Sequence, residues 1–458
     1  MSRLFAGLSR TEQNVAVSLA GVYATRMLGL FMIVPIFSKI ATEYTDYTPF
    51  LAGLAVGIYG LTQALLQIPF GRLSDKLGRK PIILFGLLIF AVGSVVAALS
   101  DSLLWVTIGR ALQGTGAIAS SLMALAADLT REEHRIKVMA FIGMSIGLSF
   151  IIAIIVGPVI NGWLGISGIF WLTSGLALIG MLIILFRVPT PVSARFHRDT
   201  EVELGWLSSA LSNTQLLRAN AGVMILHAML MASFIVFPFL LEDQLGLGIN
   251  DHWRIYLPIL FLSMGAVLPM IILAEKKRKI KQLLIVSILG LLLAEQGLRL
   301  FSDSLAGLTF MILLFFIAFN FLEASLPSLV AKLAPAAHKG TAMGVHSTAQ
   351  FLGVFIGAAS GGWLFEHYGM MSIFWFNSVL VVMWLVLAST MRTPQHFASR
   401  IVNVGTQSKL SAQALAEELS RITGVVEATV IAEDGVAYLK IEREVLDMDS
   451  LKKYSTEF

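Results

Sequence analysis

The sequence predicts an all-α membrane protein followed by a small soluble α+β domain, and three observations carry this prediction. Of 458 residues, 56% are hydrophobic and only 14% are charged. The apolar residues form blocks of about 20, the length that a helix needs to cross a hydrocarbon core about 30 Å thick. Near residue 393 the chain becomes polar, and its apolar residues begin to alternate. For most of the chain, these features exclude a water-soluble globular enzyme.

Apolar windows separated by charge, Pro or Gly predict twelve membrane-spanning helices. The predicted spans are residues 14–40, 49–73, 80–99, 103–127, 137–162, 164–187, 219–241, 253–274, 281–300, 304–331, 340–365 and 370–391. We therefore expect a six-helix bundle over 1–188, a cytoplasmic linker with an amphipathic helix over 189–218, and a pseudo-symmetric six-helix bundle over 219–393.

Positive charge is concentrated in alternate loops, which predicts the orientation of the chain in the bilayer. The clusters follow the second, fourth and eighth predicted helices and contain Arg72, Lys76, Arg79 and Lys80, then Arg131, Arg135 and Lys137, then Lys276, Lys277, Arg278, Lys279 and Lys281. We expect these loops and both termini to be cytoplasmic, with no removable signal peptide. Because topology explains the net charge of +4, no nucleic-acid partner is expected.

Residues 398–458 are predicted to form a cytoplasmic domain of ferredoxin-like βαββα order. The predicted elements are a strand at Ile401–Val404, a helix capped by Ser411 and ended by Gly424, a strand at Val425–Ile431, a turn at Asp434–Gly435, a strand at Val436–Ile441 and a helix at Met448–Tyr454. The chain contains no cysteine, so thiolate metal ligands are excluded and no metal site is expected. Regulation, self-association and simple stabilisation all remain open as roles for this domain.

The loop after the second predicted helix reads G-R-L-S-D-K-L-G-R-K-P from Gly71 to Pro81. It resembles the G-x-L-x-D-R-x-G-R-K signature of the major facilitator superfamily, with Lys76 in place of the usual Arg. The residues expected to act as a conformational latch between the two bundles are Gly71, Arg72, Asp75, Gly78, Arg79 and Lys80. A basic loop that only sets topology would explain the cations but not the spacing of Gly and Asp. The resemblance implies the 6+6 helix fold of this superfamily and transport across a bacterial-type inner membrane.

Two further segments resemble motifs of the same superfamily. Arg110 begins an R-x-x-Q-G-x-G pattern in the fourth helix, where the family's Arg is linked to proton movement; an Arg extending to the membrane surface is the alternative. Gly157-Pro158-Val159-Ile160-Asn161-Gly162 is similar to the G-P-x-x-G-G motif of drug/proton antiporters, with Asn161 in place of the first of the paired glycines. That resemblance implies export, although Gly157, Pro158 and Gly162 would also suit an ordinary helix kink.

Polar residues at helical spacing predict the lining of a central cavity, because lipid would not accept them. The candidates are Tyr23 and Arg26, then Tyr59, Gln63 and Gln67, then Asn320 and Glu323, and finally His346 and Gln350. Glu323 is the predicted proton carrier, with His346 or His227 as its partner, because a buried acid beside an imidazole suits proton exchange. Hydrogen bonding that only joins helices is the alternative.

Together these features predict a secondary active transporter that works by alternating access, with the proton gradient as its energy source and no cofactor. No G-x-x-x-x-G-K-[ST] phosphate loop, H-E-x-x-H pair or G-x-S-x-G elbow occurs, so an ATP-driven pump or an intramembrane hydrolase is not expected. Proton-coupled export of a small molecule is the preferred interpretation. A proton-coupled importer, or a sensor regulated through the C-terminal domain, is the alternative.

Overall fold

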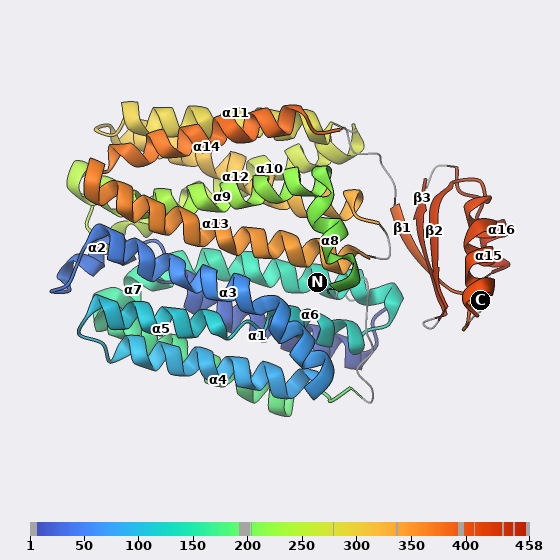
Figure 1. The fold of residues 1–458 in the computed structure, drawn as a ribbon. Helices are drawn as coiled ribbons and strands as arrows, with labels where there is room; N and C mark the ends of the chain where they lie inside the picture. The colour runs from blue at the N-terminus through green and yellow to red at the C-terminus, as the bar shows by residue number, and fades with distance from the viewer. Residues whose placement is uncertain are drawn as a thin grey trace.

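The computed structural model describes residues 7–191, 202, 204–277, 279–335, 338–392, 398–406, 408–432, 435–442 and 445–454. The long helices lie side by side in one body, and a small sheet domain lies beyond one end of it (Figure 1). The helices of that body are α1 (Arg10–Phe31), α2 (Phe37–Ile40), α3 (Pro49–Leu77), α4 (Arg79–Ala98), α5 (Leu103–Thr115), α6 (Ala119–Asp128), α7 (Glu132–Phe186), α8 (Leu204–Ser212), α9 (Thr214–Phe239), α10 (Trp253–Lys276), α11 (Ile280–Leu300), α12 (Leu305–Leu333), α13 (Lys339–Tyr368) and α14 (Met371–Ser389).

Ten of the described helices are long and apolar enough to cross a membrane. α7 supplies two crossings, because Gly165 has a non-helical conformation (φ 66°, ψ −173°) that separates its two arms. The two arms run in opposite directions, because the start and the end of α7 lie at the same end of the molecule. His134, at the start of α7, lies beside Gly7, where a Cβ would come within 3.2 Å of its ring, just before the start of α1. Val188, just beyond the end of α7, accepts a hydrogen bond from Lys80, near the start of α4. α5 and α6 are each too short to cross but together span the membrane once, which gives the twelve predicted crossings.

Two crossings predicted to be continuous helices are broken in the structure. The predicted helix over 14–40 is α1 followed by the short α2, and Pro35, which has no N–H to donate, lies in the gap. The predicted helix over 103–127 is interrupted at Gly116, which has φ −70° and ψ 52°. At Gly116 the chain comes so close to the backbone of Gly86 that a side chain would collide with it.

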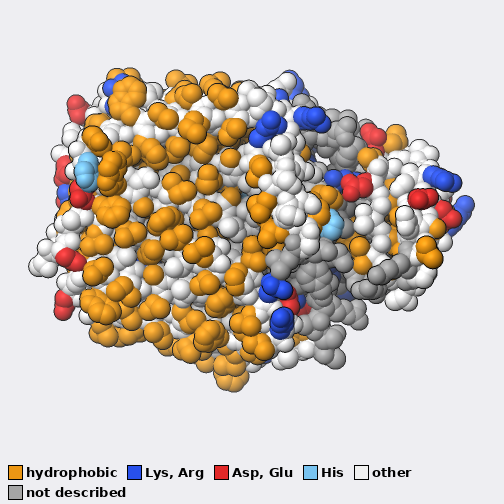
Figure 2. All heavy atoms as spheres, viewed as in Figure 1, with side chains coloured by type: hydrophobic (Ala, Val, Ile, Leu, Met, Phe, Trp, Pro, Cys, Tyr) orange, Lys and Arg blue, Asp and Glu red, His pale blue; other side chains and the backbone are white. Residues whose placement is uncertain are grey.

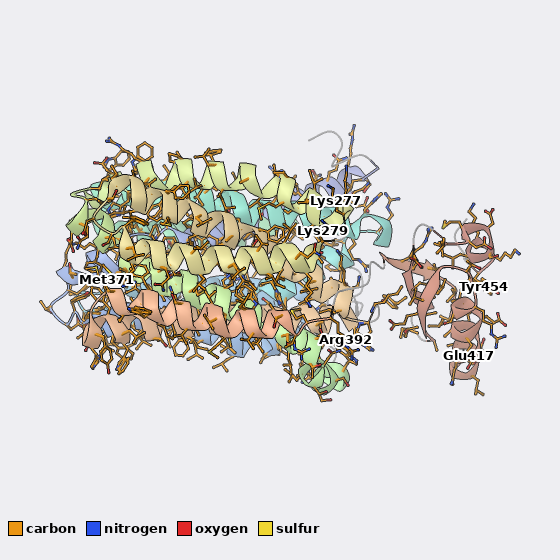
Figure 3. All side chains as sticks on the ribbon, turned by 90° about the horizontal axis from the view of Figure 1, so that it is seen from above. Lys277, Lys279, Met371, Arg392, Glu417 and Tyr454 are labelled. Carbon is orange, nitrogen blue, oxygen red and sulfur yellow. The ribbon has the colours of Figure 1, made fainter. Side chains whose placement is uncertain are left out.

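Charged side chains separate to the two ends of the apolar body (Figure 2). The end that we call the basic end carries Arg72, Lys76, Arg79, Lys80, Arg131, Lys137, Lys276, Lys277, Lys279, Lys281 and Arg392. The opposite end, the acidic end, carries Glu43, Asp46, Asp101, Glu242, Asp243, Asp251, Asp303 and Glu366. Figure 3 shows Lys277, Lys279 and Arg392 at one end and Met371 at the other.

The C-terminal domain contains β1 (Ala398–Asn403), α15 (Lys409–Ser420), β2 (Val425–Ile431), β3 (Val436–Ile441) and α16 (Met448–Lys452), which confirms the βαββα order. The described strands form an antiparallel sheet in the order β1-β3-β2, and Leu419 and Leu439 are buried in the core beneath it. The predicted cap of the first helix was wrong. Ser408 caps α15 by accepting a hydrogen bond from the Ser411 amide, so Ser411 lies inside the first turn.

Candidate substrate cavity and its polar groups

A cavity of ≈ 480 Å³ lies between the N-terminal half (α1 to α7) and the C-terminal half (α9 to α14). This volume is in the range of about 300 to 1,000 Å³ that binds drug-sized ligands. Most of its wall is apolar, and the methionines and phenylalanines in it are Met27, Met123, Met231, Met343, Phe31, Phe150, Phe319 and Phe351. Methionine side chains adapt their shape easily, so such a wall can accept ligands of differing outline.

At the acidic end the two halves are in close contact. Lys39 and Asp243 form an ion pair of 2.6 Å across the halves, and Glu366 accepts a hydrogen bond of 2.9 Å from the Phe50 amide. Nearby, Gly53 of α3 and Gly362 of α13 bring the two helix backbones so close that no side chain would fit at either position. These contacts close the space between the halves on this side.

The cavity instead extends to the basic end. Arg72 and Asp75, from the last turns of α3, line it together with Gly340 at the start of α13. The conformation is therefore asymmetric: the halves are joined at the acidic end, and the space between them reaches the basic end.

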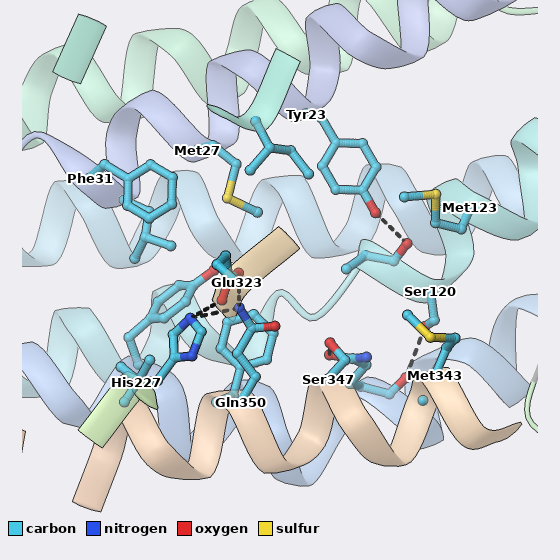
Figure 4. Close-up of a pocket in the computed structure, with 18 of the residues that line it drawn as sticks. Tyr23, Met27, Phe31, Ser120, Met123, His227, Glu323, Met343, Ser347 and Gln350 are labelled. Carbon is cyan, nitrogen blue, oxygen red and sulfur yellow. Dashed lines mark hydrogen bonds and ion pairs between the residues drawn. The ribbon is translucent and has the colours of Figure 1, made fainter. Parts of the chain in front are cut away.

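One cluster of polar side chains from the C-terminal half faces the cavity (Figure 4). The Glu323 carboxylate on α12 lies 3.6 Å from His227 Nε2 on α9, and its side chain is 37% exposed. Gln350 on α13 donates from Nε2 to Glu323 Oε1 at 3.2 Å, and the same Nε2 lies 2.8 Å from His227 Nε2. Of the two predicted partners of Glu323, His346 and His227, it is His227 that lies beside it.

The hydrogen bonds of His227 define what this cluster can do with a proton. Its Nδ1 lies 3.1 Å from the Val223 carbonyl oxygen, which can only accept, so Nδ1 carries a hydrogen. In the neutral ring, Nε2 is then an acceptor and receives the N–H of Gln350. A second proton on His227 would make Nε2 a donor toward Glu323 and would require the Gln350 amide to turn. In this structure the acid and the imidazole are neighbours at 3.6 Å, and the Gln350 amide bridges them.

The other predicted residues of the C-terminal half lie apart from this cluster. His346 is buried, contacts Asn220 Oδ1 through Nδ1 at 3.2 Å, and is absent from the cavity wall. Asn320 lines the cavity and donates to Ser263 Oγ at 3.0 Å. His346 therefore joins α13 to α9, as interhelical hydrogen bonds commonly do.

Arg26 is completely buried behind the cavity wall of the N-terminal half. Its Nη2 donates to Tyr59 Oη at 2.9 Å, to Gln63 Oε1 at 2.6 Å and to the Gly116 carbonyl at 3.0 Å. That carbonyl is available because the helix is broken there. Arg26 and Gln63 do not line the cavity, whereas the predicted Tyr23, Tyr59 and Gln67 do.

Arg110 lines the cavity but is only 1% exposed. Its Nη1 donates to Gln113 Oε1 at 2.7 Å, its Nε donates to the Ala55 carbonyl at 3.3 Å, and its guanidinium stands over the Tyr59 ring. Gln113 in turn donates to Ser94 at 2.8 Å. The side chain is thus held inside the protein and does not extend to the membrane surface.

In the loop between α3 and α4, the motif residues bond one another within the N-terminal half. Arg79 pairs with Asp75, donates to Ser74 Oγ at 3.0 Å and contacts Asp128 of α6 at 3.1 Å. Lys80 donates to the Val188 carbonyl at 2.7 Å. In this conformation Asp75 is therefore held by a cation of its own half, at the mouth of the cavity.

The residues that resemble the helix-5 antiporter motif lie where α7 meets other parts of the chain. Gly157 packs directly on the backbone at Met32, where α1 is interrupted. A side-chain carbon on Gly162 would lie 3.2 Å from Asn250 of the C-terminal half. Pro158 lies inside α7 between these contacts.

Sequence reasoning missed two features of the site. Asp128 has a completely buried side chain and is the second acidic partner of Arg79. In the sequence, the only indication of this role is that Asp128 is an acid at the last position of an otherwise apolar helix. Ser347, within 3.5 Å of Gln67 Oε1, joins the halves across the cavity and carried no signal in the sequence.

The fold and the sequence both match proteins of one family. The model of the Major Facilitator Superfamily matches residues 19–358 and 278–425. The chain is 42% identical to the inner membrane transport protein YajR of Escherichia coli (strain K12) over 95% of each chain. It is 25% identical to the multidrug resistance protein MdtH of Aeromonas hydrophila, over 79% of this chain and 89% of that one. A bacterial homologue of the human lysosomal transporter Spinster, in an inward-facing and occupied conformation, superposes with a TM-score of 0.70 and 13% identity, covering 84% of this chain and 97% of that one. The chain therefore belongs to the major facilitator superfamily and is a membrane transporter, not an enzyme.

Proposed function

We propose that this transporter exports a small, mainly apolar molecule in exchange for protons, by alternating access between its two halves. The observation that carries the proposal is Glu323, a carboxylate exposed in a mainly apolar cavity beside His227 and Gln350. An acid at membrane depth is costly and is expected to serve the transported ion or substrate. If the Glu323 carboxylate binds either a proton or a substrate but not both, the transporter exchanges one for the other across the membrane.

The cycle follows from the orientation that positive charge predicts. The basic end is assigned to the cytoplasm, so the cavity of this structure faces the cytoplasm, ready to load. A substrate with a donor or positive group binds the Glu323 carboxylate and the apolar wall. On the opposite side, protonation of Glu323 releases it. Moving one charge across 100 mV supplies roughly 2.3 kcal/mol, enough to bias two conformations of similar free energy.

Switching requires changes at both ends. The Lys39–Asp243 pair and the Glu366–Phe50 bond must separate at the acidic end. At the basic end, the last turns of α3 must approach the start of α13. Asp75 is then placed to meet the N-terminus of α13, whose positive dipole end attracts a negative charge. This is the latch role that we propose for the motif, and Arg79 holds the same carboxylate when the latch is open.

Export is favoured over import by two similarities. The segment around Gly157 and Pro158 is similar to the antiporter motif, and MdtH, a relative, is named as a multidrug resistance protein. We also propose that both termini are cytoplasmic, in a bacterial inner membrane, and that the proton gradient is the only energy source. The apolar, methionine-rich cavity favours amphiphilic substrates over sugars.

The test uses inside-out vesicles that are acidified inside and contain a pH-sensitive dye. A panel of amphiphilic cations and sugars is added to vesicles with wild type, Glu323→Gln, and the matched control Glu417→Gln, whose exposed side chain lies on α15. We expect an amphiphile to release protons in wild type and Glu417→Gln but not in Glu323→Gln. Proton release that persists in folded Glu323→Gln would contradict the role of Glu323. Release by sugars alone would contradict the proposed substrate class.

A further inference from the structure

A second membrane-embedded acid, Glu295 on α11, lies outside the cavity and has no part in the cycle described above. It is completely buried between α9, α11 and α14. Its Oε1 accepts a hydrogen bond of 3.1 Å from Asn377 Nδ2 and one of 3.4 Å from Ser233 Oγ. Asn377 Nδ2 also donates to Ser233 Oγ at 3.0 Å, so both amide hydrogens are used.

Two buried oxygens in this cluster have no hydrogen-bond partner among the described residues. They are Glu295 Oε2 and Asn377 Oδ1. The same carboxyl group and the same amide are already joined by the hydrogen bond from Asn377 Nδ2 to Glu295 Oε1. Two acceptors cannot satisfy each other, and each buried acceptor left unpaired costs about 1 to 3 kcal/mol. One proton on Oε2 would remove both deficits, because the hydroxyl would donate to Oδ1 while Nδ2 donates to Oε1.

In the part of the chain that the structure describes, no cation forms an ion pair with Glu295 within 4.0 Å, and its carboxylate is hydrogen-bonded to Asn377 and Ser233. The titratable groups on the helices around it have other contacts. Arg299, one turn along α11, stacks over the Trp375 ring at 4.7 Å, and its buried Nε has no hydrogen-bond partner among the described residues. On α9 and α12, His227 and Glu323 face the cavity and contact each other.

The remaining charged groups on these helices lie toward the ends of the molecule. Arg254 at the start of α10 pairs with Asp251, and Lys281 at the start of α11 bonds the carbonyls of Ser389 and Met391. Arg218, Lys276 and Lys332 lie near the basic end of α9, α10 and α12. Tyr256 of α10 is buried against Phe234. α14 contains no charged residue.

We infer that Glu295 binds a structural proton and, as the neutral acid, forms a two-hydrogen-bond pair with the Asn377 amide that joins α11 to α14 and, through Ser233, to α9. An unpaired carboxylate in this place would be far more costly than the neutral acid. Two of the described intramembrane acids therefore differ in their surroundings. Glu323 faces the cavity, whereas Glu295 retains its proton and fixes three helices of the C-terminal half as one body. The inference does not depend on the proposed function.

The test is infrared difference spectroscopy on the full-length protein in proteoliposomes at neutral pH. We expect the carbonyl band of a neutral carboxylic acid in wild type that is missing in Glu295→Gln and retained in Glu323→Gln at the same pH. Asn377→Ala should shift the Glu295 band without removing it, because the acid loses its amide partner. Identical spectra for wild type and Glu295→Gln would overturn the structural proton. An unshifted band in Asn377→Ala would overturn the acid–amide pair.

Thermal unfolding gives a second, independent readout. A glutamine at position 295 offers the same acceptor and donor as the neutral acid, so Glu295→Gln should melt within about 3 °C of wild type. Glu295→Ala loses both bonds and leaves Asn377 with only its hydrogen bond to Ser233, so its melting temperature should fall by more than that. A Glu295→Gln variant that melts as low as Glu295→Ala would contradict the inference, since an amide would then fail to replace the acid.

Discussion

Arg79 has two acidic partners whose surroundings differ. The Asp128 side chain is completely buried, whereas the Asp75 side chain is 32% exposed at the mouth of the cavity. Removing one partner of a buried ion pair typically costs about 3 to 5 kcal/mol, while an exposed pair contributes about 0 to 1 kcal/mol. We therefore assign Asp128 to stability and propose that the more exposed Asp75 changes partners during transport.

This difference predicts opposite results for two matched substitutions. Asp128→Asn should lower the melting temperature strongly, because Arg79 keeps a buried charge with one partner removed. Asp75→Asn should leave the melting temperature nearly unchanged and still reduce transport several-fold, because the latch loses its charge. Thermal unfolding of the purified variants and the vesicle assay measure the two effects. Transport at the wild-type rate in Asp75→Asn would remove the latch role.

At the scale of elements, the start of α5 in the broken crossing α5–α6 is held by the Asp46 carboxylate. At the acidic end, Asp46 accepts hydrogen bonds from the Leu103 amide at 2.7 Å, the Leu104 amide at 3.0 Å and Ser102 Oγ at 2.7 Å. The Leu103 and Leu104 amides belong to the first turn of α5, where N–H groups have no partner within the helix itself. A carboxylate in this position caps the helix and interacts favourably with its positive end.

The cap predicts a pH dependence of stability. Burial acts to raise the pKa of Asp46, but the hydrogen bonds from Leu103, Ser102 and Leu104 outweigh it, and its pKa is lowered. A lowered pKa means that Asp46 stabilises the fold above its unfolded-state value and that this stability is lost as the pH falls through the folded-state value. We expect Asp46→Asn to cost about 0.3 to 1 kcal/mol at neutral pH, because the charge at the helix N-terminus is lost.

Melting curves of wild type and Asp46→Asn from neutral to acidic pH check this expectation. The difference between the two proteins should be largest at neutral pH and should shrink as Asp46 becomes protonated. A difference that is constant over the whole range would mean that the charge of Asp46 has no part in the cap.

For the whole molecule, the contacts at the acidic end predict that this side must open in each cycle. The chain has no cysteine, so introduced thiols react without background. Lys39→Cys together with Asp243→Cys, joined by a short cleavable cross-linker, should abolish transport, and cleavage should restore it. Each single variant with the same reagent is the control. Full transport by the cross-linked protein would show that the halves need not separate there.

The C-terminal domain has a hydrophobic core of its own, and the described residues that form it all lie between Val402 and Tyr454. We therefore expect deletion of residues 398–458 to leave the membrane body folded and to retain a substantial part of transport in the vesicle assay. Loss of all transport by a folded deletion variant would favour the interpretation of a sensor that acts through this domain.

The pattern of residues along the chain was enough to predict the architecture, because the bilayer allows few solutions. Apolar blocks of the required length gave the crossings, and alternation with turn residues gave the βαββα order. Local exceptions were missed. The break at Gly116 arises from close contact with Gly86, and a sequence window cannot register a distant backbone. Ser408, and not Ser411, caps α15, because a capping side chain accepts from an amide two or three residues further on, and the Ser411 amide is that donor.

The candidate site could be predicted only as a set of polar residues on helices. Helical spacing placed Glu323 and Gln350 among inward-facing groups, but it could not choose between His227 and His346. That choice depends on how α9, α12 and α13 rotate against one another, which packing decides. The same packing buried Glu295 between Ser233 and Asn377, three residues far apart in the sequence. The sequence by itself determined which segments cross the membrane, because burial in lipid depends on composition. Only the tertiary structure decided which polar groups contact each other, because a hydrogen bond requires two atoms about 3 Å apart and helix packing sets that distance.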